Sequence, residues 1–437
     1  MTHHTHDHHT NDHRQRNDFD RRSFLASGVT ATASASSIAI AGCTGILRHG
    51  DDHDGFEVET VADGFAHPWA IAFLPDDDRL LVTEREGHLS LVDREGGDVE
   101  AVDGVPDVHA AGQGGLLDVA VHPDGTDEPP VYLTYSATND DGESATHLGR
   151  GRLRAEDSVL DDFEELFVAE PFVDSNGHYG SRVAFGADDR LYVTTGDRQF
   201  KDFGTDHVSQ DTTNELGATL RLEPDGSIPD DNPFVGDPDA ADAIFSYGHR
   251  NAQGMTVHPE TGELWQSEHG EEDGDELNVI EAGGNYGWPV AHTGCEYGTD
   301  EPVGDDPRER EDVVDPVYFW ECGSGGFPPA GATFYDGEAF PAWEGDLFVG
   351  NLAGRYLGRF AVDRGDDADG GANATDGDDD DDGDDDGTDP AVEVEELDPL
   401  LADRGWRIRD VAVGPDAGHL YVAADDGNAP LVRLVPD

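Results

Sequence analysis

Short apolar runs recur at even spacing along the chain, separated by stretches rich in Asp, Gly and Pro. In the first unit, runs at residues 70–75 and 79–83 flank an acidic turn, as two strands joined by a loop would. The same pattern returns at residues 117–135, 183–194, 255–267, 332–350 and 411–423. Apolar and β-branched residues dominate the runs and helical periodicity is absent, so the pattern predicts six units built from strands.

Most units continue into a third apolar run, as at residues 88–92, 217–222 and 431–435. Units that repeat radially fit a propeller better than a sandwich. The last unit has three obvious runs, and residues 56–61 can supply its fourth strand. The sequence therefore predicts an all-β fold: a six-bladed β-propeller with four-stranded antiparallel blades, spanning residues 56–437 and closed by an N-terminal strand.

Residues 363–390 interrupt this pattern with a run made almost entirely of Asp, Gly, Ala and Thr. Such a segment cannot bury enough apolar surface to offset the entropy of ordering it. We therefore expect a disordered acidic insertion on the surface of the propeller.

The N-terminal segment resembles an export signal. Arg21 and Arg22 precede a small, apolar, uncharged stretch, as in twin-arginine signals, and the stretch ends in a lipobox-like Ile-Ala-Gly-Cys sequence at Cys43. We expect residues 1–42 to be removed, Cys43 to be lipidated and residues 43–55 to form a flexible tether. The protein would then sit on the outer face of the cell membrane, held by its lipid alone. The alternative is a disordered tail with an accidental cysteine.

The charge of the chain is extreme. The formal net charge is −71, and Lys201 is the only lysine. Carboxylates spread through every loop are typical of a halophilic surface, where salt screens their repulsion. A cationic partner is the alternative interpretation. Nucleic acid is excluded as a partner because no basic stripe exists to neutralise phosphates.

Two cysteines remain beyond the expected signal, Cys295 and Cys322, in loop-like sequence. In an exported protein such a pair predicts one disulfide. Two buried thiols are the alternative.

Polar residues stand just before or at the start of the first strand in four of the units. They are Gln113, His178, Arg250 with Asn251, and Arg407 with Arg409. In a propeller these positions converge at the mouth of the central channel, which is where ligands bind. Blade packing alone does not explain their repetition.

The fourth unit continues into a loop at residues 267–278 that is dense in carboxylates and glycine. Carboxylate and carbonyl oxygens suit Ca²⁺, although the loop lacks the order of an EF-hand. In a chain this acidic, a merely solvated loop is the alternative.

Three motifs now carry a resemblance to a known family. They are GHRNAQGM at residues 248–255, SEHG…DELN at 267–278 and GGNYGWP at 283–289. In this order and spacing the chain resembles the soluble PQQ-dependent aldose and glucose dehydrogenases (the glucose/sorbosone dehydrogenase family), as a haloarchaeal-type lipoprotein, over roughly residues 60–437. The resemblance implies oxidation of an aldose at C1 to the lactone with pyrroloquinoline quinone (PQQ) and calcium. Electrons would pass to an external acceptor: a copper protein, a cytochrome or a quinone.

The resemblance also implies roles for the polar residues at the mouth. His178 matches the general base that takes the proton of the C1 hydroxyl, and Arg250 matches the residue that stabilises negative charge on the quinone oxygen. Gln113 and Asn251 match positions that contact quinone or substrate. Arg407 and Arg409 match the arginines that pair with the PQQ carboxylates.

For the metal, Gly270 and Glu271 match the positions whose backbone carbonyls hold the calcium that contacts PQQ. Glu276 and Tyr286 match ligands of a second calcium in the aldose dehydrogenase branch. Both assignments come from the resemblance.

Three departures from the family pattern weaken a restriction to glucose. Glu271 stands where glucose dehydrogenases have Pro, and Gly177 stands where they have Asp before the base. Residues 351–355 hold no lysine where the family has one that contacts the cofactor, and Arg355 is expected to replace it.

Two other functions remain open at this point. One is a calcium-dependent propeller lactonase or hydrolase without PQQ, which would not need Arg407 and Arg409 in the channel. The other is a non-catalytic extracellular binding propeller, which would have no reason to place His178 and Arg250 at the mouth.

Overall fold

The computed structural model describes residues 55–437 apart from 76, 124–127, 365–391 and 416. By its internal contacts the chain divides into two units, residues 1–52 and 53–437, and the described residues belong to the second. The predicted export signal, Cys43 and nearly all of the predicted acidic insertion lie outside the described residues. Within the described part of the chain, no helix is long and apolar enough to cross a membrane.

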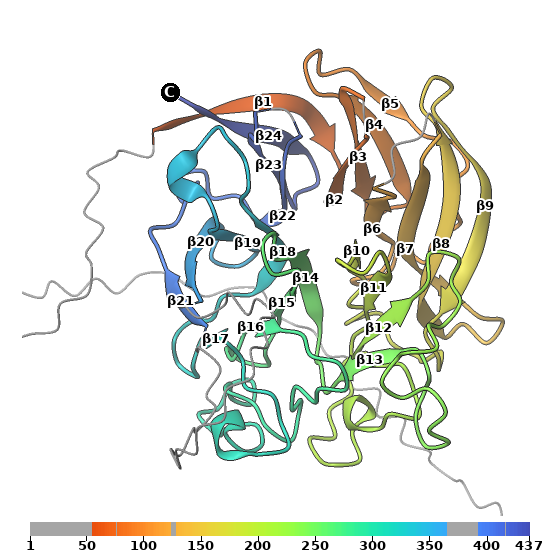
Figure 1. The fold of residues 1–437 in the computed structure, drawn as a ribbon, viewed down its shortest axis with the longest axis vertical. Coiled ribbons are helices and arrows are strands. Elements are labelled where there is room, and N and C mark those ends of the chain that lie inside the picture. The colour runs from red at the N-terminus through yellow and green to blue at the C-terminus, as the bar shows by residue number, and fades with distance from the viewer. Residues whose placement is uncertain (1–54, 76, 124–127, 365–391, 416) are drawn as a thin grey trace, which may run out of the picture. The chain divides into compact units, whose positions relative to one another are not determined.

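Six four-stranded antiparallel sheets form the blades of a propeller, as predicted (Figure 1). Blade 1 contains β2 (Pro68–Phe73), β3 (Arg79–Glu84), β4 (His88–Asp93) and β5 (Val99–Ala101). Blade 2 contains β6 (Leu116–Val121), β7 (Pro130–Thr138), β8 (Ser144–Arg154) and β9 (Val159–Val168). Blade 3 contains β10 (Val183–Phe185), β11 (Leu191–Thr194), β12 (Ala218–Leu222) and β13 (Ile244–Tyr247).

The second half of the ring follows the same plan. Blade 4 contains β14 (Ala252–Val257), β15 (Leu264–Glu268), β16 (Glu276–Val279) and β17 (Tyr318–Phe319). Blade 5 contains β18 (Pro329–Phe334), β19 (Leu347–Asn351), β20 (Tyr356–Asp363) and β21 (Glu393–Glu396). Blade 6 contains β22 (Ile408–Val413), β23 (Leu420–Ala424), β24 (Ala429–Pro436) and β1 (Phe56–Phe65). Three 3-10 turns complete the described elements: Val208–Gln210, Pro307–Glu309 and Pro341–Trp343.

The ring closes through the two ends of the propeller, because β1 pairs with β24 from Phe56 opposite Pro436 to Phe65 opposite Ala429. The predicted closure by an N-terminal strand is therefore confirmed. Blade 6 joins the first and last strands of the propeller, so opening the ring would require breaking a strand pair.

Hydroxyl groups tie neighbouring blades together around the centre. Thr83 Oγ1 accepts the Ala70 N–H within its own blade at 3.0 Å and donates to the Leu117 carbonyl of the next blade at 2.5 Å. The same bond to the next blade recurs from Thr134 to Ser181, Thr194 to Ala252 and Ser267 to Ala330. In five blades the first strand carries a bulge where it meets the second strand. This bulge re-aims the start of the strand, where the polar motifs lie.

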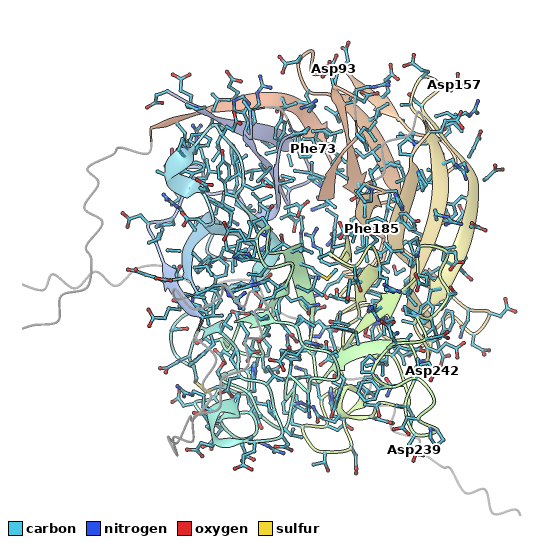
Figure 2. The ribbon with its side chains drawn as sticks, viewed as in Figure 1. Phe73, Asp93, Asp157, Phe185, Asp239 and Asp242 are labelled. Carbon is cyan, nitrogen blue, oxygen red and sulfur yellow. A yellow bond between two sulfur atoms is a disulfide. The ribbon has the colours of Figure 1, made fainter. Side chains whose placement is uncertain are left out.

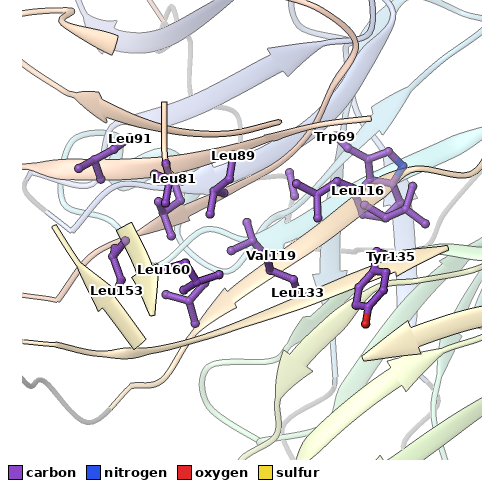
Figure 3. Close-up of a cluster of buried hydrophobic side chains, with 14 of the residues drawn as sticks. Trp69, Leu81, Leu89, Leu91, Leu116, Val119, Leu133, Tyr135, Leu153 and Leu160 are labelled. Carbon is purple, nitrogen blue, oxygen red and sulfur yellow. The ribbon is translucent and has the colours of Figure 1, made fainter. Parts of the chain in front are cut away.

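The hydrophobic core lies between the blades. In Figure 3, Trp69 and Leu81 of blade 1 pack with Leu116 and Leu133 of blade 2, all buried. The outside is covered by acidic side chains such as Asp157 and Asp239 (Figure 2). The apolar runs found in the sequence therefore form the layers that stack the blades.

A long segment between β16 and β18, irregular apart from one 3-10 turn and β17, carries the disulfide. Cys295 and Cys322 are bonded, with Cα atoms 5.5 Å apart, which is the pairing that the sequence predicts. The backbone of Cys295 also exchanges two hydrogen bonds with Glu272, of 3.0 and 3.1 Å. The disulfide therefore holds this segment against the acidic loop of blade 4.

Candidate active site

Two adjoining cavities share part of their lining, with volumes of about 240 and 580 Å³. The shared residues are Gln113, Asn251, His269, Pro328 and Ala353. The smaller cavity is lined by arginines, and the larger one by His178, Arg250 and the acidic loop. The predicted convergence of the motifs that precede the first strands is therefore found.

His178 lies just before β10 and is held in a single orientation. Its Nδ1 is 2.6 Å from Asp197 Oδ1, and its backbone N–H donates to Gln113 Oε1 at 2.7 Å. Because Asp197 occupies Nδ1, Nε2 is the ring nitrogen left for a ligand in the larger cavity. Burial, helped by the positive charge of Arg250, lowers the pKa of His178. The imidazole is therefore neutral at neutral pH and able to accept a proton.

Asp197 is the carboxylate that the sequence analysis missed. It follows β11, and its Oδ2 accepts the indole N–H of Trp288 at 2.8 Å. Burial favours its protonated form, but the hydrogen bond with His178 and the charge of Arg250 prevail and keep its pKa below the ordinary value. The repeat offers no signal for it, because Asp197 lies three residues beyond the end of β11, whereas the carboxylate residue of blade 4, Glu268, is the last residue of β15.

Arg250 precedes β14 and faces the same cavity as His178. Its guanidinium pairs with Glu271 Oε2 at 2.7 Å and lies 5.2 Å from the centre of the Trp288 ring. Glu271 also contacts Lys201 Nζ, at 2.5 and 2.6 Å. The buried carboxylate of Glu271 therefore lies between two cations, which offset the cost of burying it.

Glu268, the last residue of β15, fixes the backbone that carries the GHRN motif. Its buried carboxylate accepts the N–H groups of Arg250 and Asn251 and lies 2.7 Å from His249 Nδ1. The other ring nitrogen of His249 is 2.9 Å from Ser246 Oγ. Since all these groups are buried, the network fixes the backbone positions of Arg250 and Asn251, from which their side chains extend.

The smaller cavity is a cationic pocket lined by Arg85, Arg407 and Arg409, with Asp425 as its acidic residue. Arg409 donates to Gln253 Oε1 at 2.9 Å, and Arg407 and Arg409 reach Asp425 at 3.3 and 3.4 Å. Burial lowers the pKa of Arg409 to about 10, so it stays charged at neutral pH. Three cations around one acid provide a site for an anionic ligand.

Comparison with known proteins identifies the family of this chain. Residues 65–433 match the glucose/sorbosone dehydrogenase family. The chain belongs to this family. It is 36% identical over 383 residues to the aldose sugar dehydrogenase YliI of Escherichia coli, covering 87% of this chain and 92% of that protein. It is also 32% identical over 258 residues to quinoprotein glucose dehydrogenase B of Acinetobacter calcoaceticus, covering 54% and 53%.

Solved structures of the family share the propeller. The soluble aldose sugar dehydrogenase of E. coli, in its apo form, superimposes with a TM-score of 0.75 at 35% identity, over 87% of this chain and all of that one (100%). The PQQ-bound aldose sugar dehydrogenase of Streptomyces coelicolor gives a TM-score of 0.63 at 27% identity, over 88% and 99%. This glucose/sorbosone dehydrogenase homologue is therefore an oxidoreductase related to aldose sugar and quinoprotein glucose dehydrogenases.

In this family member the residues expected to hold calcium lie in two places. Gly270 and Glu271 line the larger cavity. Glu276 of β16 is buried with Oε1 3.4 Å from His292 Nδ1. The Tyr286 hydroxyl donates to the Val279 carbonyl at 2.5 Å, and its ring packs in a cluster with Tyr192 of blade 3 and Met255 of blade 4. Across the described ranges, no group of three or more His, Cys, Asp or Glu side chains could hold a metal.

Arg355 does not reach the site. It is exposed, donates to the Gly405 carbonyl at 3.0 Å and is absent from the lining of both cavities, to which its neighbours Leu352 and Ala353 contribute. The basic side chain that enters the larger cavity is Lys201, from the segment after Asp197. The expectation that Arg355 contacts the cofactor is therefore wrong.

Proposed function

We propose that this protein oxidises aldose sugars at C1 to the lactone, using PQQ and calcium and passing electrons to an external acceptor. The observation that carries the proposal is a neutral His178, fixed through Nδ1 by Asp197, in the same cavity as Arg250 and beside an arginine-lined pocket. The family relationship supports the reaction class.

The residues of the two cavities fit an anionic quinone. Arg85, Arg407 and Arg409 supply donors for carboxylates in the smaller cavity. Arg250 Nε and His269 Nε2 are buried atoms that find no hydrogen-bond partner among the described residues. Burial lowers the pKa of His269 well below its ordinary value, so that ring is neutral. A bound group with oxygen and nitrogen atoms would satisfy these positions.

The chemistry of the chain's own groups follows from their placement. His178 Nε2 accepts the proton of the C1 hydroxyl, and Asp197 stabilises the imidazolium that this transfer creates. Arg250 places a fixed positive charge where negative charge develops. PQQ, when bound, supplies the quinone that takes up the hydrogen and the two electrons leaving C1.

Calcium has a candidate position at the larger cavity, where the carbonyls of Gly270 and Glu271 would hold it. A second calcium at Glu276 and Tyr286 is proposed from the resemblance alone. We also propose that the protein is exported by the twin-arginine route and anchored by a lipid on Cys43 to the outer face of the cell membrane. Mass spectrometry of the mature N-terminus tests this: an unmodified chain that keeps residues 1–42 would contradict it.

The proposed function is tested by reconstitution. Protein prepared without cofactor is loaded with PQQ and Ca²⁺ in high salt and given a panel of aldoses and an artificial electron-accepting dye. We expect dye reduction that requires PQQ, Ca²⁺ and sugar together, and lactone as the product. A protein that binds no PQQ and oxidises none of the sugars would overturn the proposal.

A further inference from the structure

Lys201 occupies an unusual position for the only lysine of an acidic chain. It lines the larger cavity together with His178 and Arg250, and its side chain is 52% exposed. Its ammonium is nevertheless held on several sides. Nζ contacts both oxygens of Glu271 and lies 5.5 Å from the centres of the Phe203 and Tyr297 rings. A half-exposed lysine held in this way is already positioned to bind a ligand.

One N–H donor of the Lys201 ammonium group has no partner among the described residues. An ammonium group carries three N–H donors, and the two oxygens of Glu271 engage two of them. No other acceptor contacts Nζ within the described part of the chain. Because the side chain lines the cavity, the remaining donor is available to a ligand there.

The ligand class follows from the surroundings of this donor. Glu271 already partners Lys201 and Arg250, and Glu272 and Asp273 line the same cavity. Carboxylates therefore outnumber cations among these side chains, which favours a neutral oxygen over another anion. Tyr297 adds an exposed aromatic ring at the same rim, suited to the C–H face of a sugar.

We propose that Lys201 binds the sugar substrate, donating a hydrogen bond to a hydroxyl other than that at C1, and so determines which aldoses are accepted. This rests on the proposed function, because it assumes that the C1 hydroxyl lies at His178. Glu271 has two roles in this arrangement: it positions Lys201 for the sugar and Arg250 for the reacting centre. Gln199 lines the same cavity.

The experiment compares Lys201→Met with Lys201→Arg by calorimetric titration of aldose and by steady-state kinetics. We expect Lys201→Met to weaken sugar binding and raise KM by about tenfold to a hundredfold, because that is the effect of losing one charge-assisted hydrogen bond. The kcat and the affinity for PQQ should change little. Lys201→Arg should restore part of the binding. Arg154→Met, which removes a partly exposed positive charge that lines neither cavity, is the matched control.

Singly deoxygenated aldoses identify the partner hydroxyl. For one of them the wild type should lose as much affinity as Lys201→Met does for the parent sugar, and Lys201→Met should lose nothing further. Unchanged sugar affinity in Lys201→Met, additive losses for every deoxy sugar, or no aldose binding by the wild type would each overturn the proposal. Sugar that binds in a Lys201-dependent way without being oxidised would contradict the proposed function and leave the role of Lys201 standing.

Lys201→Met and Lys201→Arg are both expected to fold. Glu271 keeps its bond to Arg250 when Lys201 is replaced, so no buried carboxylate is left without a partner. Thermal unfolding checks this, and an unfolded Lys201→Met would be replaced in the titrations by Lys201→Gln.

Discussion

Asp197 Oδ1 lies 2.6 Å from His178 Nδ1, and both side chains are buried. The two residues flank blade 3's first two strands, one before β10 and one after β11. This carboxylate orients His178, the proposed base, in a chain where Gly177 stands in place of the aspartate expected before it. The contact leaves Nε2 of a neutral imidazole to the cavity, which is what proton abstraction requires.

Replacing Asp197 by Asn should therefore impair catalysis more than binding. The amide keeps the shape of the side chain but no longer stabilises the imidazolium or specifies its tautomer. We expect kcat to fall by about 10² to 10⁴-fold while PQQ affinity, measured by fluorescence titration, stays near that of the wild type. A variant with wild-type kcat would show that another group orients His178.

The pH dependence of kcat/KM should report His178. As the proposed base, His178 must be neutral to act, and burial with the charge of Arg250 places its pKa below the ordinary value of about 6.5. Activity should therefore be retained as the pH falls through 6.5 and decline only at lower pH. An acidic limb with its midpoint above about 6.5 would contradict the assignment.

Glu268→Gln tests the network that holds the GHRN motif. Gln preserves volume but cannot accept from two backbone N–H groups and His249 with the strength of a carboxylate. We expect kcat to fall by about tenfold to a hundredfold, with partial recovery in Glu268→Asp. Glu165→Gln is the control, because Glu165 also pairs with a histidine, His147, but lines neither cavity. Equal losses in both variants would argue against a positioning role.

Removing the disulfide should destabilise the protein and loosen the acidic loop. Cys295→Ser with Cys322→Ser opens a loop with a sequence separation of 27 residues. The expected loss of unfolding free energy is about 3 to 4 kcal/mol. Because the Cys295 backbone pairs with Glu272, the Ca²⁺ concentration needed for activity should rise as well. A lower melting temperature with an unchanged Ca²⁺ requirement would show that the disulfide does not affect the proposed calcium site.

The fold could be predicted from the sequence because every blade repeats one local pattern. Short continuous apolar runs such as those of β3 and β23 mark strands by themselves, and the repeat fixes how the strands assemble. Even closure was predictable, since blade 6 lacked a fourth strand and β1 was available.

The repeat itself predicts only those site residues that sit at equivalent places in it, whereas Gly270 and Glu271 are expected from the family resemblance. Gln113, His178 and Arg250 sit at such places, and they meet at the two cavities. Lys201 and Arg355 lie on irregular loops, where backbone conformation rather than periodicity decides which side chain enters the cavity. Arg355 has a positive φ of 62° and an exposed side chain, which a sequence pattern does not reveal.

The most direct test of the central claim is a single turnover. Protein loaded with PQQ and Ca²⁺ is mixed without oxygen with an aldose carrying hydrogen or deuterium at C1, and the quinone absorbance is followed. We predict that the quinone is reduced, that deuterium slows the reduction, and that His178→Gln binds PQQ normally but reduces it at least about 10²-fold more slowly. Reduction at the same rate in His178→Gln, or none in the wild type with sugar bound, would contradict the account.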